Sequence, residues 1–104
     1  MFPCHPALRI RIADQTVWLN DNELHLSPRE YELLLYLIRH GGLALERAQI
    51  IDDVWGGATD AHSRVLDTYI KQLRHKLSVL GKPIHTISKF GYRFDLAPEQ
   101  IAVE

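Results

Sequence analysis

The most regular hydrophobic pattern in the chain lies between residues 63 and 77. Its apolar positions are spaced by four, three and four residues: Leu66, Ile70, Leu73 and Leu77. This spacing follows the 3.6-residue period of a helix and predicts one buried stripe. The opposite side carries polar groups at the same spacing: Arg64, Thr68, Lys71 and His75. Such side chains are typical of a solvated helix surface and also of a helix that contacts phosphates and base edges, so the stretch alone leaves both interpretations open.

Residues 7–26 show a different pattern, in which apolar and polar side chains alternate in three short runs. Alternation with a period of two is typical of half-buried strands, and the turn-forming segments 13–15 and 20–22 separate the runs. We therefore expect an antiparallel meander of three strands joined by two tight hairpins. Residues 1–6 lack this alternation and are predicted to be a loose N-terminal segment.

A long helix is predicted from Pro28 to about His40. Ser27 suits the N-cap, Pro28 suits the first helical position, and Glu30 completes a capping box with Ser27. The Gly-Gly pair after His40 is expected to end the helix.

A shorter helix is predicted from about Arg47 to Val54, followed by a loop that begins at Trp55. The helix over 63–77 would then start with Asp60 or Ser63 as its N-cap. Two helices joined by a short loop, the second bearing a polar face, form a helix-turn-helix layout with a long turn.

Two strand-like segments, Ile84–Ile87 and Tyr92–Leu96, follow this helix. Residues 88–91 join them into a β-hairpin, in which Gly91 is expected to take a positive φ. A basic hairpin after a polar helix is a wing, which can reach a neighbouring groove or phosphate.

With 104 residues, the chain is expected to form one α+β domain over 1–104: a winged helix-turn-helix with an N-terminal antiparallel sheet, three helices and a C-terminal hairpin. Residues 97–104 are predicted to be a tail. The net charge is −1, but residues 1–60 carry five basic and nine acidic side chains, whereas 61–104 carry seven basic and four acidic ones. This concentration of cations around the helix 63–77 favours a polyanionic partner.

The sequence offers no catalytic, metal-binding or membrane motif. The six histidines and the single cysteine, Cys4, show no paired ligand spacing, so neither a metal nor a cofactor is expected. A nucleophile elbow and a phosphate-binding glycine loop are both absent, which argues against an enzyme. No apolar run approaches the ~18 residues of a membrane span, and no signal peptide is recognisable, so a cytoplasmic protein without membrane contact is predicted.

From Leu24 to Phe94, the order and spacing of several motifs resemble the winged-helix effector domain of OmpR/PhoB-type response regulators. The motifs are Leu-Ser-Pro-Arg-Glu-Tyr-Glu-Leu-Leu, Val54-Trp55-Gly56, Arg64 with Leu66-Asp67, Leu73-Arg74 with Lys76-Leu77, and Gly91-Tyr92-Arg93-Phe94. The resemblance implies sequence-specific binding to double-stranded DNA as the output domain of a two-component regulator of transcription. The DNA-binding domain of a ToxR-like membrane-tethered activator, or a winged helix used for protein–protein contact, would show a similar pattern.

The resemblance also implies roles for individual residues. Phosphate contacts would come from Arg47, Trp55, Lys71 and Arg74. Arg64 would engage the backbone or a base at the start of the recognition helix. Base edges would face Val65, Thr68 and Gln72, with His75 on the same surface of the helix. The wing would contribute Thr86, Ser88, Lys89 and Tyr92.

The sequence departs from the family pattern at three of these positions. Ser88 stands where an arginine is usual in the wing, and Lys89 where a glycine is usual. Gln72 replaces a base-reading arginine, which predicts a preference for adenine.

The resemblance further implies a contact of loop 55–62 with RNA polymerase and a second copy of the domain on an adjacent half-site, in head-to-tail order. If Arg47, Arg64, Lys71, Arg74 and Lys89 all neutralise phosphates, log affinity should fall with log salt at a slope of about −4 to −5.

Overall fold

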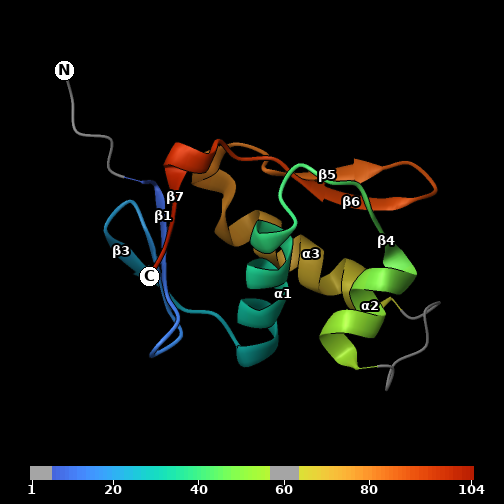
Figure 1. The fold of residues 1–104 in the computed structure, drawn as a ribbon, viewed down its shortest axis with the longest axis horizontal. Coiled ribbons are helices and arrows are strands. Elements are labelled where there is room, and N and C mark those ends of the chain that lie inside the picture. The colour runs from blue at the N-terminus through green and yellow to red at the C-terminus, as the bar shows by residue number, and fades with distance from the viewer. Residues whose placement is uncertain (1–5, 57–63) are drawn as a thin grey trace.

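The computed structural model describes residues 6–56 and 64–104. One of the two sheets in this part of the chain has four strands. Figure 1 shows this sheet at one end of the molecule and a hairpin toward the other, with helices between them. The N-terminal strands are β1 (Leu8–Arg11), β2 (Thr16–Leu19) and β3 (Asn22–Leu24), and the helices are α1 (Pro28–Arg39), α2 (Arg47–Trp55) and α3 (Val65–Lys76). The C-terminal half adds β5 (Ile84–Ile87), β6 (Gly91–Phe94) and β7 (Ile101–Val103), with the short 3-10 helices η1 (Ser78–Leu80) and η2 (Pro98–Gln100). This architecture confirms the predicted winged helix-turn-helix fold.

The predicted antiparallel meander forms, and β7 extends it. The strand order is β3-β2-β1-β7, and β7 runs parallel to β1. The expectation of a tail over 97–104 is therefore wrong for the last residues. Without β7, the outer edge of β1 would lack backbone partners; the Ile12 amide donates to the Glu104 carbonyl at 2.8 Å, and the Glu104 amide to the Ile10 carbonyl at 2.7 Å. The predicted loose segment 1–6 lies, apart from Pro6, outside the described residues.

The start of α1 confirms the predicted capping box. Ser27 Oγ accepts from the Glu30 amide at 3.2 Å, and Glu30 Oε1 accepts from the Ser27 amide at 2.8 Å. The helix ends at Arg39, and Gly42 takes a φ of 83° in the link to α2. Because a left-handed residue is strained for most side chains, the glycine pair allows the chain to turn here.

The predicted apolar stripe of α3 is confirmed as part of the core. Leu66, Ile70, Leu73 and Leu77 are all buried. The helix begins at Val65, while Asp60 and Ser63, the two predicted N-caps, lie outside the described residues. The stripe packs α3 against α1 and α2, which leaves the opposite side of α3 exposed.

The hairpin of β5 and β6, called the wing below, is joined by a third short strand, β4 (Leu45–Glu46), in the order β4-β6-β5. The positive φ of the wing turn belongs to Lys89, at 60°, and not to Gly91 as expected. Gly91 serves a close approach instead: a Cβ there would lie 1.9 Å from the carbonyl oxygen of Leu45. Because glycine has no Cβ, it lets β4 approach β6 closely enough for the two strands to pair.

Candidate nucleic-acid interface

One exposed face of α3 carries most of the polar residues that the sequence singles out. Arg64, Thr68, Lys71, Gln72 and His75 are exposed, and the last four line a surface pocket together with Lys76. The Thr68 hydroxyl donates to the Arg64 carbonyl at 3.1 Å, within the helix. Val65 is half-buried at the start of the same helix. The helix therefore presents two cations, an amide, a hydroxyl and an imidazole on one surface.

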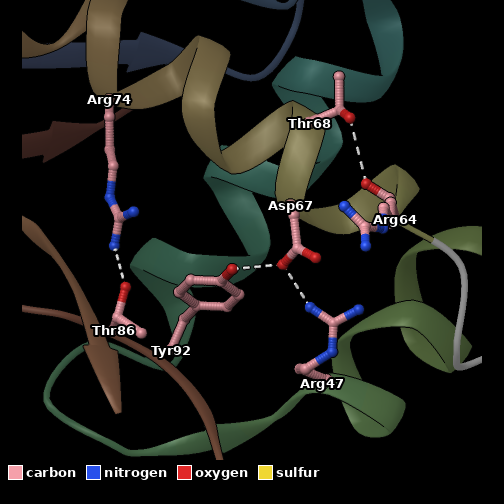
Figure 2. Close-up of polar contacts among 7 residues, drawn as sticks. All are labelled: Arg47, Arg64, Asp67, Thr68, Arg74, Thr86 and Tyr92. Atoms are coloured by element: carbon pink, nitrogen blue, oxygen red, sulfur yellow. Dashed lines mark hydrogen bonds and ion pairs between the residues drawn. The ribbon is translucent and has the colours of Figure 1, made fainter. Parts of the chain in front are cut away.

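Asp67 joins three elements at the N-terminal end of this face. Its Oδ1 accepts hydrogen bonds from Arg47 at the start of α2 and from the Tyr92 hydroxyl in β6, as Figure 2 shows. Burial raises the pKa of Tyr92 to about 12, and the hydrogen bond to the negative carboxylate adds to this rise, so the hydroxyl remains a donor. Arg47 and Tyr92, predicted separately as backbone contacts, thus share one carboxylate.

A second set of contacts ties α3 to the wing. Arg74 donates to the carbonyl oxygen of Ile84, through Nε at 3.3 Å and Nη2 at 3.2 Å. Its Nη2 also donates to Thr86 Oγ1 at 2.6 Å (Figure 2). Its guanidinium carbon lies 5.5 Å from the centre of the Tyr92 ring. These partners are neutral, so the Arg74 charge remains available to an anion while its position is fixed.

The tip of the wing is exposed over Ser88, Lys89 and Phe90. The Arg47 amide donates to the Phe90 carbonyl at 3.2 Å, which brings the start of α2 next to this turn. The exposed groups of α3 and the wing therefore come from elements that are hydrogen-bonded to one another.

Trp55, at the end of α2, is half-buried and packs edge-on against Tyr69, with ring centroids 5.5 Å apart. The guanidinium of Arg29 lies 5.5 Å from the Trp55 ring, and Arg29 also donates to the Val54 carbonyl. These contacts give Trp55 a packing role at the edge of the core. Its contact with a phosphate stays a prediction.

Lys76 is a cation whose partner the sequence does not reveal. Its Nζ lies 2.7 Å from Glu30 Oε1 and 3.0 Å from the His25 carbonyl oxygen. The capping box marks Glu30 as a helix-start residue but gives no sign of this second bond across the fold. Lys76 therefore faces α1 and the N-terminal sheet, although it also borders the exposed face of α3.

A membrane-spanning helix and a metal site, neither of which the sequence predicts, are considered for the described residues. No helix within 6–56 or 64–104 combines the length and apolarity that crossing a membrane requires. That part of the chain also brings together no group of three His, Cys, Asp or Glu side chains suited to a metal ion.

The profile of one protein family, described as "Transcriptional regulatory protein, C terminal", matches residues 21–94. The chain belongs to this family. It is a family of transcription-factor domains rather than of enzymes, and the match covers all three helices and the wing.

Relatives support the same assignment. The chain is 37% identical over 93 residues to the uncharacterized transcriptional regulatory protein YkoG of Bacillus subtilis, covering 88% of this chain but 41% of that protein. Among solved structures, the DNA-binding domain of Klebsiella pneumoniae RstA, in complex with the RstA box, superposes with a TM-score of 0.76 at 27% identity, covering 86% of this chain and 91% of that one. The response regulator DrrB, an OmpR/PhoB homologue of Thermotoga maritima, superposes with a TM-score of 0.75 at 30% identity, covering 86% of this chain and 42% of that one. The chain thus spans well under half the length of YkoG and DrrB.

Proposed function

We propose that this domain binds double-stranded DNA sequence-specifically and serves as the output domain of a two-component response regulator. One observation carries the proposal: the exposed polar face of α3 stands beside a wing that is hydrogen-bonded to the same helix. A helix of about 10–12 Å diameter fits the major groove, and an adjoining hairpin then reaches the backbone or the minor groove. A regulator that acts on chromosomal DNA works in the cytoplasm, which is the compartment we propose.

Within this surface we assign base reading to Val65, Thr68 and Gln72. The amide nitrogen of a glutamine can donate to adenine N7, and its amide oxygen can accept from the adenine N6 amino group, so Gln72 favours adenine at the position it faces. Lys71, Arg64 and Lys89 supply phosphate contacts, with Arg74, Trp55, His75 and the wing residues Thr86, Ser88 and Tyr92 along the backbone.

The ion pairs of the free protein revise the expected salt dependence. Arg64, Lys71 and Lys89 form no ion pair within residues 6–56 and 64–104, and Arg74 has neutral partners, whereas Arg47 is paired with Asp67. Four cations then carry uncompensated charge to the phosphates. We expect log affinity to fall with log salt at a slope of about −3.6, somewhat shallower than the sequence alone predicts.

The test is selection from a random pool of duplexes at about 100 mM salt, where non-specific binding is weakened but not abolished. We expect enrichment of a short motif, repeated at about one helical turn if two copies bind side by side. Thr68→Ala/Gln72→Ala should lose the motif while still binding duplex, because it leaves the cations in place. Glu99→Ala, an exposed change in η2, is the matched control and should keep the motif.

Retention of duplex without enrichment would contradict sequence-specific reading. A protein-contact role for the same surface would then be the better interpretation. A contact of loop 55–62 with RNA polymerase remains a further part of this proposal, and so does a second copy of the domain on an adjacent half-site. Residues 57–62 of that loop lie outside the described residues.

A further inference from the structure

A carboxylate lies within the surface that we propose faces DNA. Asp67 is 44% exposed in its side chain, and it sits on α3 between the exposed cations Arg64 and Lys71. A negative charge in this position repels phosphates, so it does not serve as a DNA ligand. Lys71, four residues further along the helix, is at a spacing that allows an ion pair with Asp67, but in the structure the Asp67 carboxylate pairs with Arg47 instead.

We propose that Asp67 is a positioning and charge-balancing residue, which holds Arg47 on α2 and neutralises it, and thereby limits how tightly the domain binds DNA of any sequence. The inference rests on the proposed function. Binding to random DNA depends on the number of phosphates that uncompensated cations neutralise. With Asp67 charged, Arg47 and Asp67 together bring no net charge to the surface.

The geometry separates this charge effect from a purely structural role. Asp67 Oδ1 accepts from both the Arg47 guanidinium and the Tyr92 hydroxyl. An asparagine at this position keeps a side-chain oxygen of the same size that can accept the same two hydrogen bonds. Asp67→Asn therefore removes the charge and leaves the shape of the junction nearly unchanged.

Salt titrations of binding to a random-sequence duplex measure the effect. We expect the slope of log affinity against log salt to steepen by about 0.9 in Asp67→Asn, which corresponds to one more phosphate neutralised. At about 0.1 M salt the same change tightens binding to random duplex about five- to tenfold. Arg47→Gln should do the opposite, with a shallower slope, because it leaves Asp67 uncompensated.

The double variant Arg47→Gln/Asp67→Asn should return to the wild-type slope, since both arrangements are neutral. Asp21→Asn is the matched control: it removes the same charge from an aspartate paired with an arginine, Arg9, at 3.5 Å, but in the turn between β2 and β3. We expect its slope to equal that of the wild type. Thermal unfolding of every variant in the same buffer shows whether the fold is kept. If Asp67→Asn unfolds, the shallower salt slope expected for Arg47→Gln still tests the proposal.

Two results would overturn the inference while leaving sequence-specific binding intact. A folded Asp67→Asn that binds more weakly with an unchanged slope would show that Asp67 has only a structural role. An equal gain in affinity in Asp21→Asn would show that the effect depends on the net charge of the domain and not on the position of the charge. The absence of a selected motif for the wild type would contradict the proposed function, yet the slopes would still decide the role of Asp67. Wild-type protein that binds no duplex at low salt would overturn both.

Discussion

The two ends of α3 carry ion pairs of opposite character. At the C-terminal end, Lys76 Nζ lies 2.7 Å from Glu30 Oε1, and the side chains of Lys76 and Glu30 are 32% and 5% exposed. At the N-terminal end, Asp67 pairs with Arg47, and their side chains are 44% and 32% exposed. The two pairs differ in their carboxylates: the buried Glu30 depends on the groups that hydrogen-bond to it, whereas pairs exposed on both sides contribute little to stability. The C-terminal pair therefore anchors the helix in the fold, and the N-terminal pair is placed to adjust what the surface binds.

The largest test of this difference is Glu30→Ala. The change leaves Lys76 without its carboxylate and also removes half of the capping box at the start of α1. We expect a loss of about 1–3 kcal/mol in the free energy of unfolding, measured by urea denaturation. Glu32→Ala, whose 54% exposed carboxylate lies 3.3 Å from Arg29 on the same helix, should cost less than about 0.5 kcal/mol. Equal losses in the two variants would remove the distinction between the buried and the exposed carboxylate.

The dependence of stability on acid pH also tests the role of the Glu30 carboxylate. Burial alone would raise the pKa of Glu30, but hydrogen bonds from Lys76 and Ser27 outweigh it and hold the pKa below its ordinary value of 4.5. A lowered pKa gives stability that is present above pH 4.5 and is lost as the pH falls through the folded-state value. Glu30→Gln should therefore lose less stability than the wild type between neutral pH and pH values below 4.5. Parallel curves for the two proteins would show that Glu30 does not contribute to the acid loss.

The parts of the fold that can be predicted from the sequence are those whose pattern lies within a few neighbouring residues. The apolar stripe of α3 and the capping box of α1 depend on spacings of a few residues, and both follow directly from the sequence. Strand β7 does not: Ile101–Val103 is too short to show a period, and its partner β1 lies at the other end of the chain. A three-residue strand is recognisable only once the open edge of β1 is known.

The candidate site divides in the same way. Helical spacing was enough to place Thr68, Lys71 and His75 on one surface. Helical spacing could not reveal that Asp67 pairs with Arg47 rather than with Lys71, because the contact of Asp67 with Arg47 and Tyr92 requires α2, α3 and β6 to be packed together. Gly91 is similar, since its reason is the approach of the Leu45 carbonyl from a strand more than 40 residues earlier.

Arg74 lies on α3 between Asp67 and Lys76, and Arg74→Lys tests how much its contacts with the wing contribute to stability and to DNA binding. Lysine keeps the charge but lacks the planar fork that bonds both the Ile84 carbonyl and Thr86. We expect a loss of about 1 kcal/mol in the free energy of unfolding and weaker DNA binding with an unchanged salt slope, measured by denaturation and by titration. Arg93→Lys, which alters a guanidinium bonded to Asp95 at 2.7 Å within the wing, is the control and should leave binding unchanged.

The smallest expected change is in the stability of Asp67→Asn. Because the pair with Arg47 is partly exposed and asparagine can still accept both hydrogen bonds, the free energy of unfolding should change by no more than about 1 kcal/mol. The same variant is expected to alter salt-dependent binding, whereas Glu30→Ala is expected to alter stability first. A loss in Asp67→Asn as large as that in Glu30→Ala would mean that both ends of α3 hold the fold together, and that the carboxylate at the exposed end is needed for folding rather than for control of binding.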